Sequence, residues 1–120
     1  MKKILILLFI IGGFTLNAQS LSQKFSVKDY ALKQAEKIQS ALDLSETQMQ
    51  KVLKANEFKA HSIKKYLLLN EKNGGLNGYK MSEAIKLVEE DAERASGYMD
   101  DMKRILGEDL FQKYLELFKK

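Results

Sequence analysis

The sequence predicts an all-α fold, namely one elongated, hairpin-type domain of four helices, two of them long and central. Apolar residues recur at three- and four-residue intervals along most of the chain, and no segment shows the alternation of a strand. The 120 residues are 45% hydrophobic and 30% charged, a composition that fits one small globular domain. A segment rich in Gly and Asn, residues 70–80, separates the two longest helical patterns and is predicted to be the connecting loop.

The first 18 residues have the layout of a secretory signal peptide. A basic start, MKK, precedes an apolar run over residues 4–16 and the small or polar residues NAQS. The apolar run is short for a membrane span, which favours a cleaved signal over the alternative of an uncleaved anchor helix. We predict cleavage after Ala18, so that residues 19–120 form a single helical domain in the periplasm or outside the cell.

Charge and export together argue against a nucleic-acid partner. Removal of Lys2 and Lys3 with the signal leaves 18 of the 20 basic residues against 16 acidic ones, a net charge of only +2. This excess is weak, and a secreted protein does not meet nucleic acid in its own compartment. The chain also has no Cys, so neither a disulfide nor a lipid-anchored Cys is possible.

The first helix is predicted from Val27 to Leu42. Ser26 and Asp29 form a Ser-x-x-Asp start signal. One face then carries apolar or small residues at helical spacing: Val27, Tyr30, Ala31, Ala35, Ile38 and Leu42.

The second helix, predicted from Glu46 to Leu69, begins at the stretch LSETQ. Ser45 is a favourable N-cap, and Gln48 three residues later completes a capping box. Leu44 can pack on Met49 as a hydrophobic staple. Such a cap stabilises the helix by about 0.5 to 2 kcal/mol, so the motif is interpreted as a helix start and not as a substrate contact.

This second helix is apolar on two sides. Its main stripe consists of Met49, Val52, Leu53, Ala60, Ile63 and Leu67. The opposite stripe consists of Ala55, Phe58, Ser62, Tyr66 and Leu69. The opposite stripe either packs inside the domain or forms a surface for a client protein or a dimer partner, with Phe58, Tyr66 and Leu69 as its candidate residues.

The third helix is predicted from Glu83 to Leu106 and has the spacing of a coiled-coil seam. Its apolar residues follow at alternating intervals of three and four: Ile85, Val88, Ala92, Ala95, Met99, Met102 and Leu106. Gly97 lies off this seam and disfavours helix by about 1 kcal/mol relative to Ala. It marks either a bend or a place where another chain comes near.

A last helix, predicted from Glu108 to Phe118, begins with a worn copy of the earlier motif. LGEDLFQKYL, residues 106–115, matches LSETQMQKVL, residues 44–53, at five of ten places. Gly107 stands at the cap position, and Leu106 can pack on Phe111 as Leu44 does on Met49. The helix presents an apolar side that is either a lid on the core or an adhesive surface.

The export signal, the helical domain without Cys and the two Leu-Thr-x-x-Gln-like helix starts resemble the Spy/CpxP family of periplasmic LTxxQ-motif proteins. The first motif has Ser45 where the family has Thr, and the second keeps only Leu106. The resemblance implies an antiparallel homodimer of bent helices. It also implies a chaperone that works without ATP, or a modulator of the envelope stress response, with unfolded or envelope proteins as partners.

Catalysis is not expected. His61 is the sole His and there is no Cys, so a zinc site or a nucleophile with a neighbouring base has no residues to build it. The Gly-rich loop lacks the spacing of a phosphate-binding motif. We therefore expect no cofactor, no metal and no small-molecule substrate. The alternative to a chaperone is a structural or interaction protein of the envelope with a stable helical dimer.

Overall fold

A computed structural model describes residues 20–119, of which 83% are helical, and none of these residues is in a strand. The helices are α2 (Leu21–Lys24), α3 (Val27–Leu42), α4 (Glu46–Lys72), α5 (Met81–Ser96), α6 (Tyr98–Leu106) and α7 (Glu108–Phe118). The predicted all-α class is confirmed, but the described residues form six helices and not four. The predicted signal peptide, residues 1–18, lies outside the described range.

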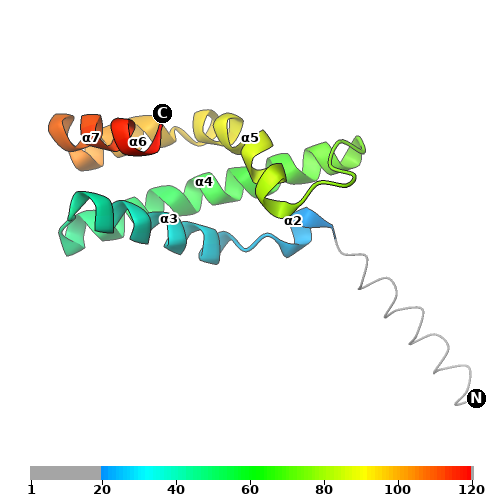
Figure 1. Ribbon diagram of the computed structural model, residues 1–120, viewed down its shortest axis with the longest axis horizontal. Coiled ribbons are helices and arrows are strands. Elements are labelled where there is room, and N and C mark those ends of the chain that lie inside the picture. Colours follow the sequence, from blue (N-terminus) through cyan, green and yellow to red (C-terminus); the bar gives the residue numbers. More distant parts are fainter. Residues whose placement is uncertain (1–19, 120) are drawn as a thin grey trace, which may run out of the picture.

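The long helix α4 organises the molecule. Its 27 residues make it about 40 Å long, and it runs through the whole body. Figure 1 shows α3 along one side of α4, and α5, α6 and α7 following one another on the other side. The C-terminal helix α7 contacts both α6 and α3, so one end of the molecule is a small bundle of four helices.

Capping residues explain where these helices begin and end. The Ser26 side chain accepts a hydrogen bond from the Asp29 backbone N–H and starts α3 at the predicted residue. Asp43, in the left-handed region with φ 53°, ends α3. The helix α4 runs three residues beyond its predicted end at Leu69, which shortens the predicted loop to residues 73–80.

The predicted third helix, Glu83–Leu106, is wrong as a single element. Gly97 adopts φ 68°, a left-handed conformation that ends α5, and α6 starts at the next residue. A Cβ at this position would meet nothing within 4 Å, so Gly97 is needed for its backbone angle and not for a close approach. Of the two interpretations of Gly97, the structure therefore supports the bend.

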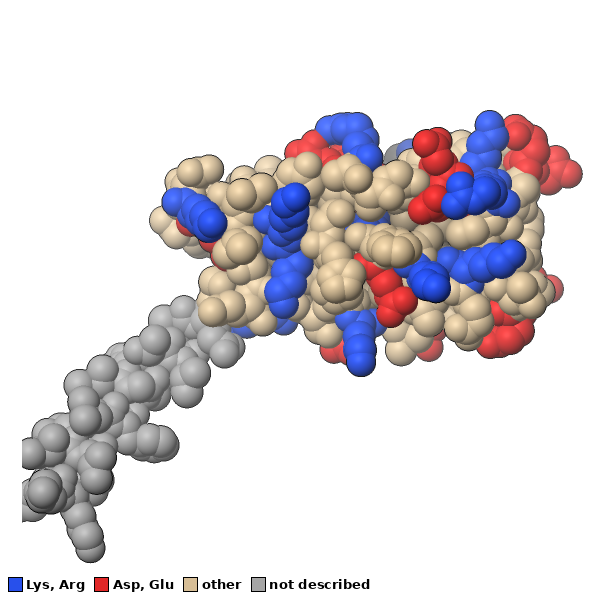
Figure 2. Space-filling view, turned by 180° about the vertical axis from the view of Figure 1, so that it is seen from behind, with Lys and Arg blue, Asp and Glu red and all other residues tan. Residues whose placement is uncertain are grey.

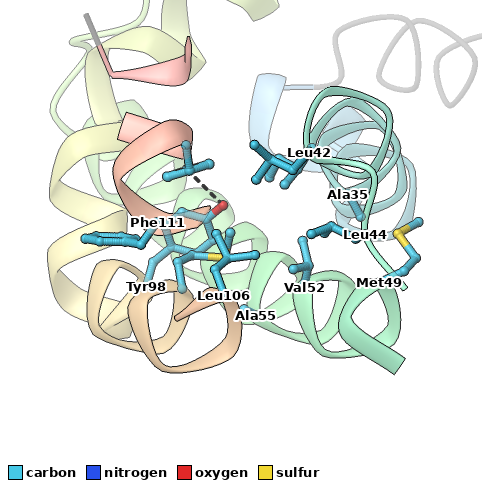
Figure 3. Close-up of a cluster of buried hydrophobic side chains, with 12 residues drawn as sticks. Ala35, Leu42, Leu44, Met49, Val52, Ala55, Tyr98, Leu106 and Phe111 are labelled. Atoms are coloured by element: carbon cyan, nitrogen blue, oxygen red, sulfur yellow. Dashed lines mark hydrogen bonds between the residues drawn. The ribbon is translucent and has the colours of Figure 1, made fainter. Parts of the chain in front are cut away.

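Two apolar clusters form the core. The first joins α3, α4, α6 and α7 and contains Ala35, Ile38, Leu42, Leu44, Met49, Val52, Ala55, Tyr98, Met102, Leu106, Phe111 and Tyr114 (Figure 3). The second lies between α4 and α5 and contains Phe25, Ala60, Ile63, Leu67, Leu76, Ala84, Val88 and Ala92. Along α4 the first cluster ends at Ala55 and the second begins at Ala60, so residues 56–59 stand at the junction.

The short helix α2 is tied to the far end of α4. The Glu71 carboxylate accepts hydrogen bonds from the Ser22 backbone N–H at 3.0 Å and from the Ser22 hydroxyl at 2.5 Å. Partial burial raises the pKa of Glu71, but the hydrogen bonds from Ser22 outweigh it and hold the pKa below its usual value.

None of the described helices is long and apolar enough to cross a membrane.

Candidate functional site: a basic groove and a buried lysine

The LSETQ motif has the geometry that its sequence predicts. The Ser45 hydroxyl accepts a hydrogen bond from the Gln48 backbone N–H at 3.2 Å, and the Gln48 side chain accepts one from the Ser45 backbone N–H at 3.3 Å. Leu44 and Met49 are both buried in the first apolar cluster. The motif therefore orients the start of α4, and these bonds are made entirely within the chain.

The second copy keeps only the apolar half of this arrangement. Gly107 precedes α7 with φ 79°, and no side chain caps the helix there. Leu106 and Phe111 are buried in the first cluster, as their counterparts in the first motif are. The helix α7 thus begins without the hydrogen bonds that fix the start of α4.

The opposite stripe of α4 is divided by the fold. Ala55 is buried in the first cluster, and Tyr66 packs half-buried against the second. Phe58 and Leu69 are exposed, with 57% and 45% of their surface accessible. Of the three candidate residues, Phe58 and Leu69 are therefore accessible to another molecule, whereas Tyr66 is partly buried against the core.

Phe58 lines a groove of about 320 Å³ between α4 and α6, which we call the basic groove. It is lined by Lys51, Lys54, Ala55, Phe58, Asp101, Arg104 and Ile105. Arg104 Nη2 and Asp101 Oδ1 lie 2.6 Å apart and pair with each other. Lys51 and Lys54 have no ion-pair partner within residues 20–119, so the groove carries an uncompensated positive charge beside an apolar wall.

Basic side chains are also spread over the surface more widely. Figure 2 shows one face of the molecule, on which Lys and Arg lie along the length of the body with uncharged surface and several Asp and Glu between them. A partner approaching such a face meets charge first and apolar contacts second.

The residues of the predicted seam do not face one partner. Val88 and Ala92 are buried in the second cluster, and Met102 is buried in the first. Ile85 and Met99 are half-buried, and Ala95 is exposed. Since Val88, Ala92 and Met102 are covered by the chain's own helices, they form two separate intramolecular contacts on either side of Gly97.

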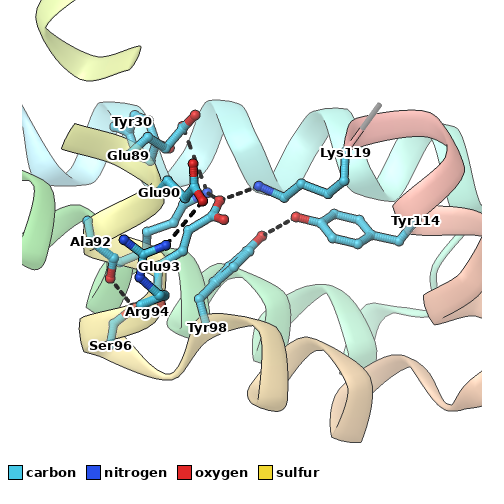
Figure 4. Close-up of polar contacts among 11 residues, drawn as sticks. Tyr30, Glu89, Glu90, Ala92, Glu93, Arg94, Ser96, Tyr98, Tyr114 and Lys119 are labelled. Carbon is cyan, nitrogen blue, oxygen red and sulfur yellow. Dashed lines mark hydrogen bonds and ion pairs between the residues drawn. The ribbon is translucent and has the colours of Figure 1, made fainter. Parts of the chain in front are cut away.

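The sequence interpretation missed a buried polar cluster at the junction of the two apolar clusters (Figure 4). Lys59 of α4 is only 2% exposed, and its ammonium lies 3.2 Å from Glu93 Oε2 and 4.0 Å from Glu89 Oε2. Lys119 reaches the same Glu93 oxygen at 2.5 Å from the C-terminal end of α7. The Lys59 ammonium also lies over the Tyr98 ring, 4.1 Å from its centroid.

Tyrosines from three helices complete this cluster. The Tyr30 hydroxyl of α3 donates a hydrogen bond to Glu89, and the Tyr114 hydroxyl of α7 donates one to the Tyr98 hydroxyl at 3.1 Å. Lys59, Glu93 and these tyrosines thereby connect α3, α4, α5, α6 and α7 at one place.

Burial is the largest cause of the pKa shifts in this cluster. It lowers the pKa of Lys59 below its usual value, although Glu93 and Glu89 favour the charged ammonium. It raises the pKa of Tyr98 to about 12, and burial together with neighbouring groups raises the pKa of Tyr30 and Tyr114 well above the ordinary tyrosine value. The tyrosines therefore stay neutral throughout the physiological range.

A signal for this cluster is present in the sequence. Val52, Asn56, Lys59, Ile63 and Leu67 follow at intervals of four, three, four and four, so two polar residues occupy the buried stripe. Asn56 is fully buried, and its Nδ2 donates a hydrogen bond to the Val52 carbonyl at 2.9 Å. A charged residue in register with an apolar stripe, as Lys59 is, predicts that an opposite charge is buried with it but not which residue carries that charge; in the structure it is Glu93.

The described residues show no grouped metal ligands. His61 is exposed on α4, and within residues 20–119 no three His, Asp or Glu side chains are grouped to hold a metal ion. The arrangement can bind through the basic groove, and its buried charges can hold helices together.

No protein family model, no curated protein and no solved structure matches this chain.

Proposed function

We propose that the chain is a periplasmic chaperone that works without ATP, or a modulator of the envelope stress response, and that it binds unfolded or partner proteins through the basic groove. The observation that carries the proposal is Phe58, a large aromatic side chain with 57% of its surface exposed, beside two lysines that have no ion-pair partner among residues 20–119. An apolar side chain exposed in a groove is typical of interaction sites. The resemblance of the LSETQ motif and the export signal to the Spy/CpxP family favours the same function.

The groove suits reversible binding. Lys51 and Lys54 attract an acidic segment over a distance, and Phe58 and Ile105 then offer a small apolar contact. A groove of about 320 Å³ accommodates a side chain or two of a client and not a folded domain. A client held by so small a contact can dissociate without an energy source.

The first prediction tests this function with one substitution. Phe58→Ser removes the apolar wall of the basic groove, and because Phe58 is exposed, the fold should be unaffected. Loss of about 1.5 kcal/mol or more of apolar burial weakens client binding by roughly tenfold or more. The measurement is light scattering of a chemically unfolded protein mixed with an equimolar amount of the chain without residues 1–18.

Leu32→Ser is the matched control, because Leu32 is 45% exposed on α3, which does not line the groove. The unaltered chain and the Leu32→Ser variant should slow aggregation, and Phe58→Ser should not. Equal protection by all three chains would remove the groove from the proposal. No protection by the unaltered chain would remove the chaperone and favour the alternative, a structural or interaction protein of the envelope.

An antiparallel homodimer is a separate part of the proposal. Leu68 and Leu69 are both nearly half exposed at the far end of α4, away from the basic groove, and offer an apolar surface to a second copy. Light scattering of the purified chain gives its mass directly. A monomer at the concentration of the aggregation assay would refute the dimer and leave the groove unaffected.

A further inference from the structure

The C-terminal helix α7 is attached to the body at its two ends in different ways. At its start, Gly107 has φ 79° and no capping side chain, and a Cβ there would meet nothing within 4 Å. At its end, Lys119 contacts the buried Glu93 carboxylate of α5. Between them, Phe111 and Tyr114 cover the first apolar cluster. The start of α7 is therefore a glycine turn beside the exposed ion pair of Lys103 and Glu108, and its end is held by an electrostatic contact with a buried carboxylate.

The electrostatic contact depends on a single carboxylate that is shared by two ammonium groups, so loss of its charge affects both. The ammonium groups of Lys59 and Lys119 both contact Oε2 of Glu93, so one carboxylate neutralises two cations. The second carboxylate, Glu89, lies 4.0 Å from Lys59 and already accepts a hydrogen bond from Tyr30. If Glu93 lost its charge, Lys59 would stay buried with one distant counterion and would need water.

The fold provides one route for that water. A cleft of about 560 Å³ lies between α5 and α7, and its lining includes Glu93, Leu115 and Lys119. Lys119 lines this cleft and pairs with Glu93, so movement of the end of α7 would widen the cleft beside the buried Lys59–Glu93 pair and admit water to it.

We propose that α7 is a releasable latch, hinged at Gly107 and locked where Lys119 meets Glu93, and that its release uncovers the apolar cluster beneath it. The helices that α7 contacts are α3 and α6, and their cluster residues Leu42 and Leu106 are at most 5% exposed while α7 is docked. A released helix of 11 residues does not hold its own hydrogen bonds in water, because isolated helices of this length are marginal. Release therefore appears as loss of amide protection in α7 alone.

Hydrogen–deuterium exchange of the chain without residues 1–18 tests the latch. Glu93→Gln keeps the shape of the side chain and removes its charge. Loss of the charged hydrogen bonds should speed exchange of residues 108–118 by roughly ten- to a hundredfold, while the central part of α4 keeps its rate. The matched control is Glu90→Gln on the same helix, because Glu90 is exposed and, among the described residues, pairs only with Arg94.

Two further variants keep the outcome decisive if Glu93→Gln fails to fold. Lys119→Ala removes the surface half of the lock without leaving a buried charge unpaired, and should speed exchange in the last turn of α7. The double variant Lys59→Met with Glu93→Leu leaves no buried charge unpaired but removes the partner of Lys119, so it should speed exchange in the last turn of α7 as Lys119→Ala does. Unchanged exchange of α7 in Lys119→Ala, or equal acceleration in α4 and α7, would overturn the latch.

The exchange experiment contains no client protein, so the latch and the proposed chaperone function stand or fall separately. If both hold, the open form offers an unfolded client more apolar surface than the basic groove alone.

Discussion

At the scale of single residues, the most consequential feature is the buried charge of Lys59. Lys59 carries an ammonium into the body of the molecule, where Glu93 and the face of the Tyr98 ring replace water. Removing one partner of such a pair costs about 3 to 5 kcal/mol, since the other charge is left buried. The hydrogen bonds of Ser45 and Gln48 follow from a local spacing and could be predicted. The partner of Lys59 could not, because it lies 34 residues away and only packing brings it near.

Glu71 makes the stability of the molecule depend on pH. Its pKa is lower in the folded chain than in the unfolded one, so the stabilisation it contributes is present above the unfolded value near 4.5 and is lost as the pH falls through the folded value. We expect Glu71→Gln to lower the free energy of unfolding by about 1 kcal/mol at pH 7, the low end for a charged hydrogen bond, because the carboxylate is partly exposed.

Urea unfolding followed by circular dichroism checks this at pH 7 and below pH 4. The difference between Glu71→Gln and the unaltered chain should shrink as the pH falls, whereas Glu36→Gln, on the exposed face of α3, should show little difference at either pH. A difference that stays constant with pH would show that the charge of Glu71 does not stabilise α2.

At the scale of the helices, periodicity and caps account for most boundaries. The predicted limits of α3 and α7 agree with the structure, and α4 is longer by three residues. A bend at Gly97 was one of two alternatives, but two separate helices were not predicted, because the seam from Ile85 to Leu106 keeps its spacing through the glycine. The spacing could not show that the residues before Gly97 pack in the second apolar cluster and those after it in the first. One straight helix could not pack against both clusters in this way.

Gly97→Ala distinguishes a bend from a continuous helix by the sign of its effect. In the observed fold, Ala would be forced into the left-handed region, which costs about 1 kcal/mol or more. In a continuous helix, the same change would stabilise by about 1 kcal/mol. We expect the free energy of unfolding, measured in urea, to fall. A rise would mean that α5 and α6 form one helix in solution.

For the molecule as a whole, a polar junction separates two apolar clusters along one long helix. The all-α class and the elongated shape follow from the sequence, because helical spacing covers nearly the whole described chain. The basic groove does not, because its residues come from α4 and α6 and meet only once α5 has turned at Gly97. Phe58 was recognisable as a candidate from its stripe, but Arg104 and Ile105 were not recognisable as its neighbours.

The central claim is that the basic groove binds unfolded protein, and the most direct test is to locate the bound client. Amide exchange should be compared for the chain alone and with an equimolar, permanently unfolded protein. The proposal predicts slower exchange in residues 51–58 and 101–105, and no slowing at these positions in Phe58→Ser. Slowing confined to other segments, or none in any segment while aggregation is still suppressed, would contradict it.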